Sequence, residues 1–331
     1  MISSATAGPA GRRLVARCAA CLLAMGLWMV PAGAAQSIDG VALFESGELE
    51  EASAHFAERL EEDRGDAEAA YYLGRVAMER EQYAEAAEYF EQARRAKPQQ
   101  ARHHYWVGAA LGLQAQSANV VQQARLARKT RAAFEQAVTL NPDYVEAREA
   151  LIQFYLQAPG ILGGSVGAAR AQAEAISEID PWRGHLATAV IHRHEGEHRE
   201  AVAAYRAAID LHPDWTYAYT LLLEYYEERG DREDALDLME EARAAVPGEA
   251  DFHYHYARLA LLSQDALEPA AEAAESFIAL ADQPDAQADG YHLLGRIRLA
   301  EGDTEAARAA WTMALTLDPE HRAAQQALEK L

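Results

Sequence analysis

Residues 288–319 constrain the possible fold more than any other part of the chain. Large apolar side chains recur there at helical spacing, at Tyr291, Leu294, Trp311 and Leu317. A Gly302-Asp303 pair interrupts the pattern in the middle, and Pro319 closes it. Apolar residues three and four positions apart line one face of an α-helix, and a glycine commonly ends a helix. The segment therefore predicts two amphipathic helices joined by a tight turn.

The same pattern recurs along most of the chain. In residues 67–100 its markers are Leu73, Gly74, Tyr83, Ala86, Phe90, Ala93 and Pro98. This spacing resembles the tetratricopeptide repeat, in which an aromatic-Leu-Gly group is followed by alanine, an aromatic residue and proline. The resemblance covers residues 37–331. It divides them into units at about 37–66, 67–100, 101–144 with a helical insert, 145–181 with a Gly-rich loop, 182–213, 216–247, 250–287 and 288–319, and a cap at 322–331.

The resemblance implies an all-α fold, a right-handed superhelical α-solenoid of about eight stacked antiparallel helix pairs with a C-terminal capping helix. The residues themselves agree with this expectation. Small residues such as Gly74 and Ala86 let two helices approach closely, while Phe90 fills the volume beside them. The apolar content is dominated by alanine, which favours helix over strand, so we expect no β-sheet.

The first 35 residues differ in kind from the rest. Three arginines precede an uncharged run from Cys18 to Val30, and Pro31 and the small residues Ala32-Gly33-Ala34 follow. This order is typical of a secretory signal peptide, so we expect a periplasmic or secreted protein. The alternative is an uncleaved anchor in the membrane. Both cysteines, Cys18 and Cys21, fall inside this segment, so the mature chain would carry no thiol.

The charge of the mature chain limits its partners. The leader holds three of the 30 basic residues and none of the 52 acidic ones, so its removal leaves a net charge of −25. A field of that sign repels nucleic acid and anionic membrane surfaces. We expect a protein or peptide partner, neutral or basic unless it meets a locally positive surface, and no membrane span after the signal is cleaved.

In the tetratricopeptide repeat family, the first helix of each pair lines a concave groove that binds extended peptides. The resemblance therefore implies a peptide-binding set on these helices: Tyr71, Arg75, Tyr105, Arg193, Tyr217, Tyr254, Arg258, His292 and Arg296. In three of these units a ring stands four residues before an arginine, on one helical face. Aromatic rings and guanidinium groups are common anchors of binding surfaces. The other interpretation is that these arginines pair with acidic residues of neighbouring units and only align the stack.

A secondary contact patch is predicted in the helical insert, residues 114–131. It consists of Arg125, Arg128, Lys129 and Arg131, the one basic run in the mature chain. This patch could dock an acidic partner, or acidic residues of adjacent units could neutralise it. The Gly-rich segment 159–167 lacks the lysine and the preceding strand of a phosphate-binding loop, so we interpret it as a long turn.

The chain offers little chemistry for a metal site or an active site. Four histidines cluster between residues 185 and 198, but His192 and His194 point in different directions on a helix, so we assign them a structural role. We predict no metal and no cofactor. No thiol remains after signal cleavage and Ser165 has no histidine at a recognisable spacing, so we predict that the protein is not an enzyme.

These observations favour an exported, non-enzymatic scaffold that binds a protein or peptide in its concave groove. The alternative is a structural or assembly subunit of a cell-envelope complex. That subunit would make contact through its outer face and the insertions at 114–131 and 159–167. An enzyme built on a helical scaffold is a third and much weaker hypothesis.

Overall fold

The computed structural model describes residues 39–264 and 266–331, which contain 17 α-helices, one 3-10 turn and no strand. The predicted leader lies outside the described residues. The elements are α1 (Gly40–Glu45), α2 (Leu49–Glu62), α3 (Ala67–Glu79), α4 (Tyr83–Ala96), α5 (Ala101–Gln116), α6 (Val120–Leu140), α7 (Val145–Gln157), η2 (Gly160–Leu162), α8 (Val166–Ile179), α9 (Pro181–Glu195), α10 (His198–Leu211), α11 (Thr216–Arg229), α12 (Arg232–Ala245), α13 (Ala250–Ser263), α14 (Leu267–Leu280), α15 (Pro284–Ala300), α16 (Thr304–Leu317) and α17 (Arg322–Glu329).

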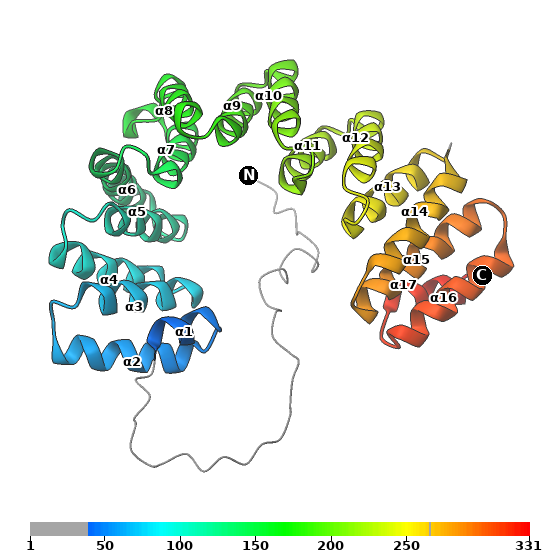
Figure 1. Ribbon diagram of the computed structural model, residues 1–331, viewed down its shortest axis with the longest axis horizontal. Helices are drawn as coiled ribbons and strands as arrows, with labels where there is room; N and C mark the ends of the chain where they lie inside the picture. The colour runs from blue at the N-terminus through cyan, green and yellow to red at the C-terminus, as the bar shows by residue number, and fades with distance from the viewer. Residues whose placement is uncertain (1–38, 265) are drawn as a thin grey trace, which may run out of the picture. The chain divides into compact units, whose positions relative to one another are not determined.

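Residues 40–331 form one compact unit in which every helix packs against the next one in the chain (Figure 1). The short connections make neighbouring helices antiparallel, so the unit is a linear stack of helix pairs. First helices of successive pairs also touch, α1 with α3, α7 with α9, and α13 with α15. The predicted all-α solenoid of stacked helix pairs is confirmed. None of the described helices is long and apolar enough to cross a membrane.

Several pairs interlock through a glycine on one helix and a ring on the other. A Cβ atom at Gly74 would lie 2.6 Å from the ring of Phe90, and one at Gly108 would lie 2.6 Å from Phe134. In the last pair Trp311 packs against Gly295, and its indole Nε1 donates to the carbonyl of His292 at 3.1 Å. The missing Cβ atoms let the helices approach closely enough to bury these rings.

Turns and caps follow the repeat. The connection after a second helix contains a proline in five places, Pro98, Pro142, Pro213, Pro247 and Pro319. Asp66 begins α3 by accepting hydrogen bonds from the amides of Glu68 and Ala69, each at 3.0 Å. In the turns of five pairs a glycine has positive φ, such as Gly302 at +87°, whereas Glu81 and Gln264 take this conformation in the α3–α4 and α13–α14 turns.

Two units depart from the regular pattern. In the third, α6 has 21 residues where α4 has 14, and Asn119 begins it by accepting a hydrogen bond from the amide of Gln122. In the fourth, the 3-10 turn η2 stands between α7 and α8. Towards the C-terminus, α15 begins at Pro284, four residues before the regular pattern of residues 288–319. Its first turn extends the pair beyond the length of the shorter repeats.

Candidate partner-binding face

The predicted peptide-binding residues lie on α3, α5, α9, α11, α13 and α15, the first helices of their pairs. We call the surface of these helices the first-helix face. Its most distinctive feature is Arg75 on α3. The guanidinium carbon of Arg75 lies 5.0 Å from the ring centroid of Phe44 on α1 and 4.4 Å from that of Trp106 on α5. This one cation therefore links three successive first helices through ring contacts.

Arg75 has no carboxylate partner among the described residues. Its Nη1 donates to the hydroxyl of Tyr71 at 3.1 Å, while its Nε is buried without a hydrogen-bond partner. Tyr71 itself is only 7% exposed, with its ring packed near Phe90 and Trp106. Tyr71 therefore positions Arg75 through its hydroxyl, and its ring belongs to the core and adds almost nothing to the surface.

A second unpaired cation, Arg102, stands at the start of α5. Its guanidinium carbon lies 4.7 Å from the ring centroid of Tyr71, and it forms no ion pair within the described ranges 39–264 and 266–331. Arg102 is not among the residues predicted from the sequence. The available signal was its position in the first turn of a first helix, shortly before the ring pair Tyr105 and Trp106.

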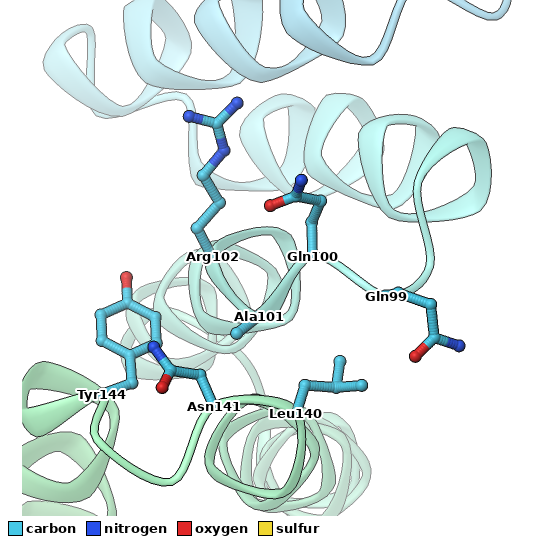
Figure 2. Close-up of a pocket in the computed structure, with 7 residues that line it drawn as sticks. All are labelled: Gln99, Gln100, Ala101, Arg102, Leu140, Asn141 and Tyr144. Atoms are coloured by element: carbon cyan, nitrogen blue, oxygen red, sulfur yellow. The ribbon is translucent and has the colours of Figure 1, made fainter.

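Arg102 lines a pocket of about 300 Å³ formed by the third unit and the end of the second (Figure 2). One wall comes from the α4–α5 connection and the start of α5, and the other from the end of α6 and the α6–α7 connection. Figure 2 shows Arg102 and Gln100 on one side, with Tyr144, Asn141 and Leu140 opposite them. The complete lining is Gln99, Gln100, Ala101, Arg102, Leu140, Asn141 and Tyr144.

The pocket is built to make polar contacts. Burial raises the pKa of Tyr144 and of Tyr105, whose ring centroid lies 5.2 Å from that of Tyr144, so both phenols keep their protons. Gln100 precedes α5 but makes no capping hydrogen bond with its side chain. Guanidinium, phenol and amide groups together can hold a carboxylate and the backbone amides of an extended chain.

Two other predicted arginines are fully engaged within the protein. Arg193 on α9 donates to Glu228 at 2.6 Å, and Arg258 on α13 donates to Glu227. Both glutamates belong to α11, so the two arginines tie α9 and α13 to the helix between them. At these two positions the arginines pair with acidic residues of a neighbouring unit, as the second interpretation of the sequence expects.

The remaining members of the predicted set have different environments. Tyr217 is 57% exposed beside Trp182, whereas Tyr105 and Tyr254 are half-buried, Tyr254 against Phe277. His292 is half-buried next to His321, and burial lowers its pKa to about 4. Arg296 is exposed and forms no ion pair with any residue that the structure describes. None of these five residues lines the pocket that contains Arg102.

The predicted secondary patch lies on α6. Arg125, Arg128 and Lys129 are exposed and have no ion pair with a described residue. Arg131 differs, because it lies 3.5 Å from Glu135 of its own helix and packs against Gly163 of the Gly-rich turn. Acidic residues of adjacent units therefore do not neutralise the three exposed cations through any contact in the described chain.

One group of side chains has the composition of a metal site. Atoms of His192, Glu195 and Glu197 lie within 4.8 Å of one another. The Nδ1 atom of His192 is 2.6 Å from a carboxylate oxygen of Glu197, and Arg170 forms ion pairs with both glutamates. Since a guanidinium already contacts both carboxylates, the arrangement is an ion-pair network that joins α8 to the end of α9.

Comparisons with known proteins agree with the repeat pattern. Family models described as tetratricopeptide repeat match residues 43–110 and 288–321. A comparison with curated proteins found no match.

Solved structures of similar proteins include yeast Tom70, with a TM-score of 0.54, 14% sequence identity, and coverage of 87% of this chain and 59% of that one. A tetratricopeptide repeat protein from Parabacteroides merdae ATCC 43184 gives a TM-score of 0.49 and 14% sequence identity, and the match covers 88% of this chain and 94% of that one. YrrB, described as a TPR protein with an unusual peptide-binding site, gives a TM-score of 0.41 and 26% sequence identity. The match covers 55% of this chain and 87% of YrrB.

Proposed function

The chain is a tetratricopeptide repeat protein, and from this premise we propose that it is a non-enzymatic scaffold that binds an extended protein segment. The segment lies along the first-helix face of the N-terminal units, α1 to α7. Its acidic side chains meet Arg75 and Arg102, and its backbone amides meet the polar groups of the pocket beside Tyr144.

One contrast carries this proposal. Arg193 and Arg258 are held by glutamates of α11, whereas Arg75 and Arg102 have no carboxylate partner among the described residues. The whole chain has 52 acidic against 30 basic residues, so acidic groups are abundant. Two guanidinium groups beside aromatic rings, left without acids in such a chain, are suited to receive carboxylates from a partner.

The rings around these cations add to the binding surface. Phe44 and Trp106 hold the guanidinium of Arg75 between neighbouring first helices, which limits its freedom before a partner arrives. A pre-organised guanidinium loses less conformational entropy on binding than a free one. The protein as a whole is negatively charged, but an acidic segment can still bind at this locally positive site. Salt at moderate concentration screens the negative charges that lie more than about 10 Å away.

The proposal includes export. The leader pattern of residues 1–35 favours cleavage and a periplasmic or secreted mature protein, and the alternative is an anchor that keeps the leader. Mass spectrometry of the protein isolated from cells distinguishes the two. A mature N-terminus close to Gln36 supports cleavage, and a chain that retains residues 18–30 contradicts it.

Photo-crosslinking from the pocket tests the binding function. A crosslinking residue in place of Gln100 should give discrete protein adducts in cells, and the same residue in place of Glu88 on α4 should not. Arg75→Glu combined with Arg102→Glu should abolish the Gln100 adducts. Arg193→Glu combined with Arg258→Glu changes the charge equally and should leave them. Adducts that survive the first pair of changes contradict the proposal.

A second candidate function is a structural subunit of a cell-envelope assembly that makes contact through its outer face. One observation favours it: the insertions at 114–131 and 159–167 expose aliphatic side chains, Val120 and Val121 at 80% and Ile161 at 90%. In that case a crosslinking residue in place of Val121, and not one in place of Gln100, should capture a protein partner.

A further inference from the structure

A second surface, separate from the pocket, combines exposed aliphatic side chains with unpaired cations. We call it the α6–η2 surface and define it by Val120, Val121, Arg125, Arg128, Lys129 and Ile161. Its three aliphatic residues are the most exposed large hydrophobic residues in the described chain. The two elements touch each other, since α6 contacts η2 and the side chain of Arg131 packs against Gly163.

The register of α6 directs these side chains outward. Val121, Arg125 and Arg128 follow one another at steps of four and three residues, so they form a stripe along the helix. The buried side chains of the same helix, Leu126, Thr130 and Phe134, occupy a different face and pack inward. The extra turns of α6 therefore present a cationic stripe with valines at its N-terminal end.

The charge of this surface is opposite to that of the rest of the protein. The chain has a formal net charge of −22, yet Arg125, Arg128 and Lys129 have no carboxylate partner among the described residues. Exposed aliphatic groups and unpaired cations on adjacent elements are the combination that lets a protein lie on an anionic bilayer. We propose that the α6–η2 surface docks on a membrane of anionic phospholipids.

In the docked state the cations contact lipid phosphates, and Val120, Val121 and Ile161 enter the boundary between headgroups and acyl chains. Single aliphatic side chains that project into solvent suit a soft lipid surface. A protein partner would instead need a matching hollow for each of them. The remaining acidic surface is repelled by the lipid, but salt screens this repulsion beyond about 10 Å. The contact is therefore peripheral, reversible and restricted to this surface.

Vesicle flotation tests the proposal. The chain without residues 1–35 is suitable, because its packed unit begins at Gly40 and the apolar leader would bind lipid by itself. It should float with vesicles made of phosphatidylglycerol and phosphatidylcholine in equal parts. It should not float with pure phosphatidylcholine, and salt should weaken the binding.

Three variants separate the surface from general effects of charge. Arg125→Glu combined with Arg128→Glu should lower vesicle affinity about tenfold or more, because each basic group near an anionic surface contributes substantially to binding. Val121→Asp combined with Ile161→Asp should lower it similarly. Arg199→Glu combined with Arg232→Glu gives the same net charge elsewhere and should leave it within about twofold. Unchanged circular dichroism and unfolding midpoints show that each variant is folded.

Two results would overturn the proposal. One is that the wild-type chain does not bind anionic vesicles. If a protein is then also crosslinked from Val121, the surface is assigned to a protein partner instead. The other is an equal loss of binding in the Arg199 and Arg232 control, which assigns the effect to net charge. The groove function has its own readout in the Gln100 crosslinks, so either can fail alone.

Discussion

The guanidinium carbon of Arg75 lies 4.4 Å from the centroid of the Trp106 ring, so a cation of one repeat rests on an indole of the next. Contacts of this kind contribute about 0.5 to 2 kcal/mol, depending on how far the cation is desolvated. We expect Arg75→Ala and Trp106→Leu to show a coupling energy of about 1 kcal/mol in a double-mutant cycle followed by urea unfolding. Arg80, which pairs with Glu50, serves as the control. A cycle of Arg80→Ala with Trp106→Leu should be additive, and an additive Arg75 cycle would contradict the contact.

The two glycines of α5 should respond in opposite directions to the same substitution. A methyl group at Gly108 would lie 2.6 Å from the Phe134 ring, whereas one at Gly112 would lie 3.6 Å from Thr130. Gly108→Ala should therefore lower the free energy of unfolding by about 1 to 3 kcal/mol through overpacking. Gly112→Ala should raise it by up to about 1 kcal/mol, because alanine favours the helix. Urea unfolding of both variants tests the interlock, and a stabilised Gly108→Ala protein would argue against it.

The helix pairs could be predicted from the sequence because each marker residue has a local cause. Gly74 and Phe90 indicate that the two helices of a pair approach closely, and Pro98 marks the end of the helix pair. These signals lie within about 35 residues of one another and need no knowledge of the neighbouring unit. The fold class follows from them directly.

The candidate binding face was harder to predict, because the ion pairing of each arginine depends on which side chains the next unit places beside it. Arg75 and Arg258 both follow a tyrosine by four residues, yet only Arg258 meets a glutamate. That glutamate, Glu227, stands 31 residues earlier in the chain, so the pairing depends on the register between α11 and α13. The burial of Tyr71 likewise arises from packing against Trp106 of the following unit. Helical spacing within one unit carries no information on either contact.

Charge reversal at one ion pair should show whether Arg258 stabilises the stack. Arg258→Glu places two acidic groups together at the α11–α13 junction and should lower the free energy of unfolding by about 1 kcal/mol. Glu227→Arg in the same chain should restore most of that loss. Thermal unfolding at low and high salt measures both effects, and salt should shrink the difference. If the double reversal is no more stable than Arg258→Glu alone, the pair does not align the stack.

The stability of the protein should fall as the medium becomes mildly acidic, and His103 is one reason. Its side chain is fully buried, and burial, followed by the charge of Arg102, lowers the pKa of His103 to about 4. In the unfolded chain the ring takes up a proton near pH 6.5, so between pH 6.5 and 4 the unfolded state binds more protons. The neutral ring's contribution is therefore complete above pH 6.5 and is lost as the pH falls towards 4, at a cost of about 3 kcal/mol.

Replacing His103 should remove this part of the pH dependence. His103→Gln carries no titratable ring, so its free energy of unfolding should fall less steeply than that of the wild type between pH 6.5 and 4.5. The measurement is urea unfolding at a series of pH values. The difference between the free energies of unfolding of the two proteins at each pH removes the contribution of the other titratable groups, because both proteins share them. His292, whose pKa burial also lowers to about 4, should add a second and separate increment when changed to glutamine. Parallel profiles for wild type and His103→Gln would show that the folded protein accepts the proton at this site without loss of stability.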